Sequence, residues 1–209
     1  MNRPTSRPRR SRNRAATEQA LLDACGTLLL RDGADGIGVN NVVAEAGVGK
    51  DLIYRYFNGL PGLIKAWAER SETWPNSAEL IGDAATFDAL ALKQQVQCIF
   101  RNYLQALRSR PVLMRILASE LMNPTEITSI LEDASDHIGR ELARSVQGIG
   151  EADREDIVSI SMVFYTMLNY ICIRAVTSPH MYGMDLREED SWVRVQKVMD
   201  DVIDRYLHD

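Results

Sequence analysis

Only three cysteines and three histidines occur in the 209 residues, and none is spaced like the ligands of a metal site or the members of a catalytic triad. The glycines form no loop of the Walker or dinucleotide-binding type. Cys25, Cys98 and Cys172 include no CxxC pair, so we expect reduced packing residues, with a redox-sensing cysteine as the alternative. Enzyme activity, a cofactor and a metal ion find no support in the sequence, and we expect none of the three.

Long hydrophobic runs are missing as well. No uninterrupted apolar stretch reaches the roughly 18 residues of a membrane-spanning helix, and the basic N-terminus lacks the apolar core of a secretory signal. We therefore expect a cytoplasmic protein without a membrane segment. No strand pattern occurs. The apolar residues recur instead with helical spacing between glycine and proline breaks, so an all-α chain of about nine helices is predicted.

Acidic residues are absent from residues 1–14, which hold six arginines, although the whole chain has a net charge of −5. This distribution indicates an N-terminal module that binds a polyanion and a C-terminal part that does not. Residues 1–14 have no apolar periodicity and are predicted to be a disordered basic arm. The arm either contacts DNA phosphates and the minor groove or serves only as a solubilising tail.

Two short helices joined by a tight turn are predicted over residues 39–57. Valine and alanine side chains at i, i+3, i+4 and i+7 form one face of the first helix, and Gly47 ends it, because that position usually needs a positive φ. The second helix has an apolar face, and its other side presents Lys50, Asp51, Tyr54 and Arg55. Polar, planar and cationic side chains on a short helix suit the major groove of B-DNA.

This region resembles the helix-turn-helix of the tetracycline-repressor (TetR) family of bacterial regulators, on the run Ala46-Gly47-Val48-Gly49-Lys50-Asp51-Leu52-Ile53-Tyr54-Arg55-Tyr56-Phe57. The resemblance extends over about residues 15–67. It implies a three-helix DNA-binding domain at residues 15–62, followed by a helical ligand-binding and dimerisation domain at residues 63–209. It also implies contacts to double-stranded DNA from Asn40, Gly49, Lys50, Asp51, Tyr54, Arg55 and Tyr56.

Several positions depart from the family pattern. Asp51 is an acid where the family often has a small residue, and an acid facing DNA is repelled by phosphate unless it accepts from a cytosine amino group. The family usually has Ser or Thr at Gly49, where the side chain caps the recognition helix. It often has Thr at Gly38, which caps the preceding helix and reaches a phosphate, and Lys-Glu at Leu60-Pro61. The missing hydroxyl at Gly49 and the missing lysine at Leu60 support an alternative in which the protein is a helical ligand-binding or interaction protein that has lost specific DNA binding.

The two C-terminal helices are predicted to form a homodimer. The helix at residues 153–177 has two apolar stripes and therefore needs two packing partners. The helix at residues 188–208 carries a helix–helix seam at four- and three-residue steps, made of Trp192, Val195, Met199, Val202 and Tyr206. Two such helices per subunit make a four-helix interface, whose two-fold symmetry matches a palindromic operator.

Aromatic and methionine residues of the middle helices are either core or the walls of a ligand cavity. The resemblance favours the cavity, because the C-terminal domain of the family commonly holds an inducer. The predicted ligand-binding residues are Phe100, Tyr103, Leu104, Met114, Leu117, Phe164, Met167 and Tyr170, with Arg174 as an anchor for an acidic group. The expected function is a ligand-responsive transcription regulator, most simply a repressor released from its operator by a small apolar or aromatic effector.

Overall fold

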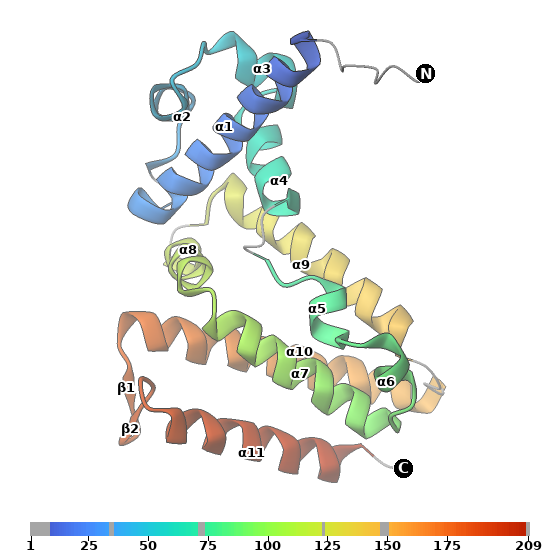
Figure 1. Ribbon diagram of the computed structural model, residues 1–209. Helices are drawn as coiled ribbons and strands as arrows, with labels where there is room; N and C mark the ends of the chain where they lie inside the picture. Colours follow the sequence, from blue (N-terminus) through green and yellow to red (C-terminus); the bar gives the residue numbers. More distant parts are fainter. Residues whose placement is uncertain (1–8, 34–35, 71–73, 123, 147–150, 208–209) are drawn as a thin grey trace, which may run out of the picture. The chain divides into compact units, whose positions relative to one another are not determined.

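The computed structural model describes residues 9–33, 36–70, 74–122, 124–146 and 151–207 (Figure 1). These residues form eleven α-helices and one two-stranded antiparallel ribbon, which confirms the all-α class. The chain divides into two compact units. The first comprises residues 1–71 and 119–131, and the second comprises residues 72–118 and 132–209.

The first unit is a three-helix arrangement with a fourth helix packed on it. Its helices are α1 (Arg9–Asp32), α2 (Val39–Ala46), α3 (Asp51–Phe57) and α4 (Leu60–Arg70). Helix α1 packs against α2 and α4, and α4 packs against α3. The start of α4 lies so close to the end of α3 that a Cβ at Gly62 would come 1.7 Å from the Phe57 carbonyl oxygen. Only glycine fits there, and the contact sets how α4 leaves the helix-turn-helix.

Helix α1 begins at Arg9, so residues 9–14 of the predicted disordered arm are helical. Arginine is a good helix former, and Arg14 Nε donates a 2.8 Å hydrogen bond to Glu18 one turn later. The remaining arm, residues 1–8, lies outside the described residues. The predicted domain boundary at residue 63 also differs from the observed division, because α4 and residues 119–131 belong to the first unit.

The second unit is built around α7 (Leu92–Arg108), which packs against four other helices. These are α5 (Ser77–Ile81), α6 (Ala84–Asp88), α10 (Glu151–Thr177) and α11 (Glu189–Tyr206). Helices α8 (Pro111–Met122) and α9 (Glu126–Ser145) begin in one unit and end in the other. Apolar faces of α7, α8, α10 and α11 contribute to a single core cluster.

Three short elements were not predicted. Helices α5 and α6 are each capped by a side chain: Asn76 accepts from the Glu79 N–H and Asp83 from the Thr86 N–H, both at 2.9 Å. One turn of helix is too short to show periodicity. The segment after α10 contains the ribbon of β1 (His180–Met181) and β2 (Met184–Asp185).

Two residues of the α11 seam, Trp192 and Met199, pack inside the protomer. The prediction that they lie in a dimer interface is therefore wrong. Trp192 is 4% exposed and Met199 is 0% exposed. The Trp192 indole donates a 2.8 Å hydrogen bond to the Leu186 carbonyl, and α11 packs on α7. An ion pair between Arg101 and Asp200, at 2.7 Å, also joins α7 to α11. Seam spacing indicates that a helix has a helical partner, but it does not tell whether the partner belongs to the same chain.

Replacing Met199 by alanine is expected to lower the free energy of unfolding by about 2–5 kcal/mol, because a fully buried side chain leaves a cavity in the protomer core. Val193, on another side of the same helix, is 59% exposed, and Val193→Ala should change stability by less than about 0.5 kcal/mol. Urea unfolding of both variants measures the difference. Equal, small effects would contradict the packing of Met199 inside the protomer.

Candidate nucleic-acid interface and cavity

The turn between α2 and α3 has the geometry that the sequence predicts. Gly47 adopts a left-handed conformation with φ of 64°, and its N–H bonds to the Val43 carbonyl. Val42 and Ile53 are fully buried, so each helix has one face fixed to the rest of the unit. The opposite face of α3 is thereby held in solvent.

Six of the seven predicted DNA-contacting residues are exposed, on α3, just before it and, for Asn40, on α2. Tyr54 is 55% exposed, and the remaining exposed members are Asn40, Gly49, Lys50, Asp51 and Arg55. Tyr56 is half-buried, and its ring lies 5.1 Å from the guanidinium carbon of Arg14 and 5.9 Å from that of Arg55. The surface therefore combines the phenol of Tyr54, the guanidinium groups of Arg14 and Arg55 and an ammonium group. These groups suit contacts to phosphates and base edges.

Arg14 belongs to this surface, although the sequence placed it only in the arm. It lies on α1 and lines a recess together with Tyr54, Arg55 and Asn58. The Glu18 carboxylate accepts from Arg14 and orients the guanidinium over Tyr56. The spacing of Arg14 and Glu18 by four residues was the available signal, because it favours extension of α1 backward to Arg14.

Gly49 and Asp51 both depart from the family pattern, and they lie side by side in the structure. A Cβ at position 49 would lie 2.7 Å from an oxygen of the Asp51 carboxylate. Asp51 is the first residue of α3, where a negative charge interacts favourably with the helix dipole. The exposed carboxylate lies beside position 49 in this structure, and a side chain there would make it rotate away. Gly38, by contrast, caps α2 without a side-chain hydrogen bond, and its Cβ would meet nothing within 4 Å.

A cavity of about 320 Å³ lies within the second unit. Its walls come from α7, α9, α10 and the segment leading into α5. The lining residues are Trp74, Pro75, Leu80, Val96, Ile99, Phe100, Tyr103, Ile138, Gly139, Leu142, Val146, Ile157, Val158, Ser161 and Tyr165. A concave, mainly apolar site of this size is typical of small-molecule pockets.

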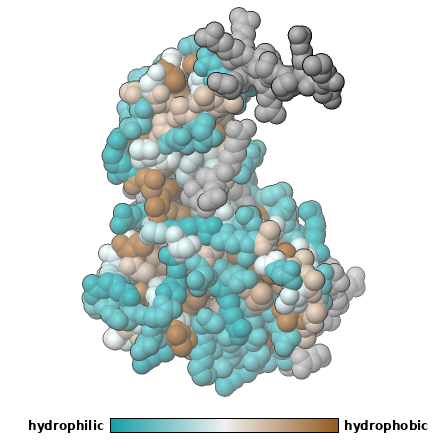
Figure 2. Space-filling model, in the orientation of Figure 1, coloured by the Kyte–Doolittle hydropathy of each residue, from teal (hydrophilic) through white to brown (hydrophobic). Residues whose placement is uncertain are grey.

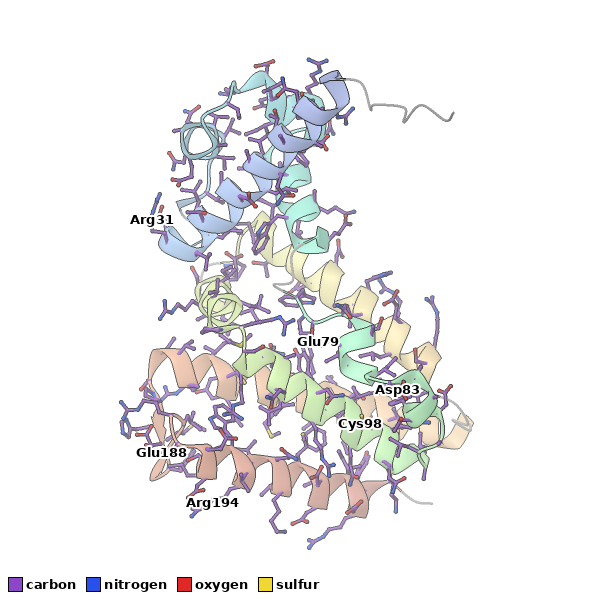
Figure 3. The ribbon with its side chains drawn as sticks, viewed as in Figure 1. Arg31, Glu79, Asp83, Cys98, Glu188 and Arg194 are labelled. Atoms are coloured by element: carbon purple, nitrogen blue, oxygen red, sulfur yellow. The ribbon has the colours of Figure 1, made fainter. Side chains whose placement is uncertain are left out.

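The α5 wall is fastened to α7. The Asn102 side chain donates a 2.8 Å hydrogen bond to the Leu80 carbonyl, and Arg110 pairs with Glu79 at 2.7 Å. Figure 3 shows Glu79 on α5 and Cys98 on the neighbouring α7, where the Cys98 thiol lies 3.9 Å from the Ile81 carbonyl oxygen. These contacts hold one side of the cavity in place.

The aromatic side chains at the cavity also contact one another and their neighbours. The rings of Phe100 and Phe164 meet edge to face at 5.2 Å, and those of Tyr103 and Tyr165 stack at 5.8 Å. The Asn169 amide donates a 2.8 Å hydrogen bond to the Tyr103 hydroxyl oxygen. Burial raises the pKa of Tyr103 well above its usual value, so this hydroxyl stays neutral.

Of the predicted ligand-binding residues, Phe100 and Tyr103 line the cavity. Leu104 and Phe164 are buried in the core, and Leu117 and Met167 are partly buried against it. Met114 lines a second recess of about 190 Å³, and Tyr170 is 52% exposed. Arg174 is not among the lining residues, because its guanidinium donates to Ser178 and to the His180 carbonyl beyond α10. The α9 and α10 walls were missed, since aliphatic residues there read equally well as core.

The two buried cysteines, Cys25 and Cys172, stay protonated at neutral pH and offer no reactive thiolate. Burial raises the pKa of both Cys25 and Cys172 to about 12. Within the described ranges, no group of three or more His, Cys, Asp or Glu side chains could hold a metal ion. Neither feature points to redox or metal chemistry.

The two units together define an all-α protein with an N-terminal helix-turn-helix and a C-terminal helical domain that contains a cavity. No family model and no curated protein matches the sequence. Solved structures do match. A TetR-family regulator from Streptomyces coelicolor A3 is 18% identical with a TM-score of 0.55, covering 94% of this chain and 97% of its own.

Two further structures agree. A TetR family transcription regulator from Marinobacter aquaeolei VT8 is 15% identical with a TM-score of 0.55, covering 91% of this chain and 96% of its own. The transcriptional regulator FadR from Bacillus subtilis, in complex with stearoyl-CoA, is 16% identical with a TM-score of 0.55, covering 91% and 99%. The chain therefore has the fold of TetR-family transcriptional regulators, as the resemblance at residues 46–57 implied.

Proposed function

We propose that this protein is a dimeric, DNA-binding transcription regulator whose DNA affinity is controlled by a small molecule in the cavity of the second unit. The exposed face of α3 carries the proposal, because its cationic and planar side chains project from a helix whose other face is buried. The fold, shared with TetR-family regulators, supports the same role. A cytoplasmic repressor, released from its operator by the effector, is the simplest form of this regulator.

We propose that a second copy of the chain packs against the exposed apolar face of α10 in a homodimer. Between Asp156 and Arg174 this helix has no charged residue, yet Val158, Met162 and Val163 are each more than half exposed. The exposed apolar face contrasts with the mainly hydrophilic surface drawn in Figure 2. Val198 and Val202 of α11 are exposed as well. The proposed interface therefore still uses the last two helices, but through their outer faces rather than through Trp192 and Met199.

The same stretch of α10, Glu155–Thr177, is long and apolar enough to cross a membrane by length and composition, which corrects the expectation that the chain has no such segment. The mean hydropathy of this stretch stays high although it contains Ser, Thr and Asn, whereas these residues interrupt a purely apolar run. Ile160, Phe164 and Leu168 are buried against the other helices of the second unit, which favours a core helix. Only 39% of the window is buried, so the rest of the helix needs another partner.

Coupling between effector and DNA has more covalent routes than the chain segment that follows α4. The chain also passes between the two units within α8 and within α9. Ile138 and Leu142 of α9 line the cavity, whereas residues 126–131 of the same helix belong to the first unit. The start of α9 is fixed by the buried Glu120 carboxylate, which accepts hydrogen bonds from Thr125 and Thr128.

We infer that an effector acts by shifting α9. The size of the effect is limited by the difference in effector affinity between the DNA-binding and the released states, typically about 1–3 kcal/mol, or roughly 5–150-fold. By linkage, operator DNA weakens effector binding by the same factor. FadR, which has a similar fold, is in complex with stearoyl-CoA, and the apolar acyl chain of that molecule supports an effector with an apolar part.

Binding to DNA is tested with fragments from the region flanking the gene of this protein. Fluorescence anisotropy is expected to reveal specific binding whose affinity falls steeply with salt concentration, because cationic side chains release counterions from the phosphates. A specific site should contain an inverted repeat with half-sites near one helical turn apart, or a multiple of it. Absence of binding to any such fragment would favour the helical ligand-binding protein without DNA binding.

Removal of residues 1–8 tests the arm. These residues contain two arginines, Arg3 and Arg7, and α1 begins only at Arg9. Each lost phosphate contact should flatten the slope of log K against log salt by about 0.9, so a decrease of up to roughly 1.8 is expected. Circular dichroism should show unchanged helix content. An unchanged slope would assign the arm to the solubilising role.

A further inference from the structure

We infer that the ligand of the cavity in the second unit carries no formal charge. This inference rests on the proposed function and specifies the chemistry of its effector. Among the residues that the structure describes, none of those that line the cavity is Asp, Glu, Lys, Arg or His. The polar side-chain groups of these described lining residues are the hydroxyls of Ser161, Tyr103 and Tyr165 and the indole N–H of Trp74. The sequence-based expectation of an acidic ligand held by Arg174 is thereby replaced.

Burial of an ionised carboxylate, sulfonate or phosphate without a counter-charge costs several kcal/mol. The arginines at the C-terminal half of α7 and just beyond it are engaged by acids. Arg101 pairs with Asp200, Arg108 with Glu189 and Arg110 with Glu79. None is available to neutralise a ligand without breaking an existing ion pair. The described walls therefore offer no counter-charge to a carboxylate or phosphate group that is buried among them.

The polar groups of the described lining suit few hydrogen bonds to a ligand. The Tyr103 hydroxyl accepts a hydrogen bond from Asn169, which leaves its own O–H to donate, and its ring stacks on Tyr165. Ser161 adds one hydroxyl from α10. A neutral molecule with an apolar body and at most one or two polar groups matches this supply of partners.

Gly139 shows where the ligand space meets α9. It lies in the middle of this helix and lines the cavity, and a Cβ there would meet nothing within 4 Å. A glycine inside a helix costs about 1 kcal/mol relative to alanine. Its neighbours Ile138 and Leu142 are only partly buried. Gly139 is itself exposed, so it lies at the solvent-facing edge of the cavity, where a larger side chain has room to extend.

The inference is tested with two fluorescent probes that share one skeleton. N-phenyl-1-naphthylamine is uncharged, and 1-anilinonaphthalene-8-sulfonate is the same molecule with a sulfonate group. Titration of the full-length protein should show saturable binding of the uncharged probe, one per chain, at least about tenfold tighter than binding of the sulfonate, because the sulfonate must be desolvated without a partner. Equal or tighter binding of the sulfonate at the same site would overturn the inference.

Variants at Gly139 locate the probe. Gly139→Phe should weaken binding of the uncharged probe by at least about tenfold, because its ring fills ligand space that a small alanine side chain leaves open. Gly139→Ala improves helix propensity in the same way and should retain binding. If Gly139→Phe folds poorly, Ser161→Leu fills the cavity from the α10 wall. Unchanged binding of the uncharged probe in both filled variants would place the probe elsewhere and overturn the inference.

The probe experiment and the DNA-binding experiment can fail independently of each other. The probes report on the cavity whether or not the protein binds DNA. A protein that prefers the uncharged probe but binds no DNA would refute the regulator and leave the ligand class standing. A protein that binds DNA and releases it only with carboxylate or phosphate compounds would refute the ligand class and leave the regulator standing.

Discussion

A glutamate in place of Met162 is expected to convert the protein from a dimer to a monomer and to remove detectable operator binding. Met162 is 67% exposed on α10 and lies in the stretch without charged residues. A two-fold interface would bury the introduced carboxylate twice, once in each copy. Since burial of an unpaired carboxylate costs several kcal/mol, the dissociation constant of the dimer should rise by at least about a hundredfold.

Loss of the dimer has a second consequence for DNA. A dimer binds two half-sites in one event, whereas a monomer must bind each half-site separately and loses the gain from linkage. Sedimentation velocity at micromolar concentration measures the oligomeric state, and anisotropy measures operator affinity.

The matched control places the same charge on an exposed part of α7. Gln105 is exposed and lies outside the proposed interface, so Gln105→Glu should leave both the dimer and DNA binding intact. A monomeric wild-type protein at micromolar concentration would contradict the proposal. So would a Met162→Glu variant that remains dimeric.

The helix-turn-helix could be predicted because it is determined locally. The burial of Val42 and Ile53 follows from the period of the apolar residues, and the left-handed turn follows from Gly47. Both signals lie within twenty residues of each other. The start of α1 was misplaced because arginine-rich segments read as disordered, although arginine has a high helix propensity and Arg14 pairs with Glu18.

The partner of α11 could not be predicted from its seam. Trp192 and Met199 have the spacing of any helix that packs on another helix, and only the tertiary structure assigns α7 as the partner. The exposed apolar residues of α10 were visible in the sequence as a second stripe. Which stripe faces the core and which faces outward depends on packing between distant segments.

The sequence predicted a mainly apolar cavity, but not most of the residues that line it. Phe100 and Phe164 touch each other, yet only Phe100 lines the cavity. A cavity is the space left where helices do not meet, so no residue type marks it. The helices that form its walls, such as α7 and α9, carry many charged residues, and only the tertiary structure tells which side chains face the space. The glycine in the middle of α9 was the available local signal.

Gly49 and Asp51 illustrate how two departures can compensate for each other. The sequence suggested two separate weaknesses of the recognition helix, a missing cap and an acid facing DNA. The Asp51 carboxylate lies where a side chain at position 49 would extend, at the N-terminal end of α3. The recognition helix therefore keeps a negatively charged group at its start, which is favourable for the helix dipole.

Arg55→Ala is expected to weaken operator binding by about 1–3 kcal/mol, or roughly 5–150-fold, and to relax preference at one base pair. Arg55 is exposed in the last turn of α3, on the face opposite the buried Ile53. Guanine offers two acceptors that match the two-pronged guanidinium group. Arg55→Lys keeps the charge but loses this geometry, so it should recover the salt slope without recovering the base preference.

Arg14→Ala separates phosphate contacts from base contacts. Arg14 comes from α1 and is held over the Tyr56 ring at 5.1 Å, so it is assigned to a phosphate. Its loss should weaken binding by a similar factor for all sequences and reduce the salt slope by about 0.9. Lys65→Ala, at an exposed position on α4, serves as the control for a lost surface charge. Wild-type affinity and base preference in Arg55→Ala would remove α3 from the base-reading role, and the salt dependence of Arg14→Ala would then show whether the surface binds DNA through phosphates alone.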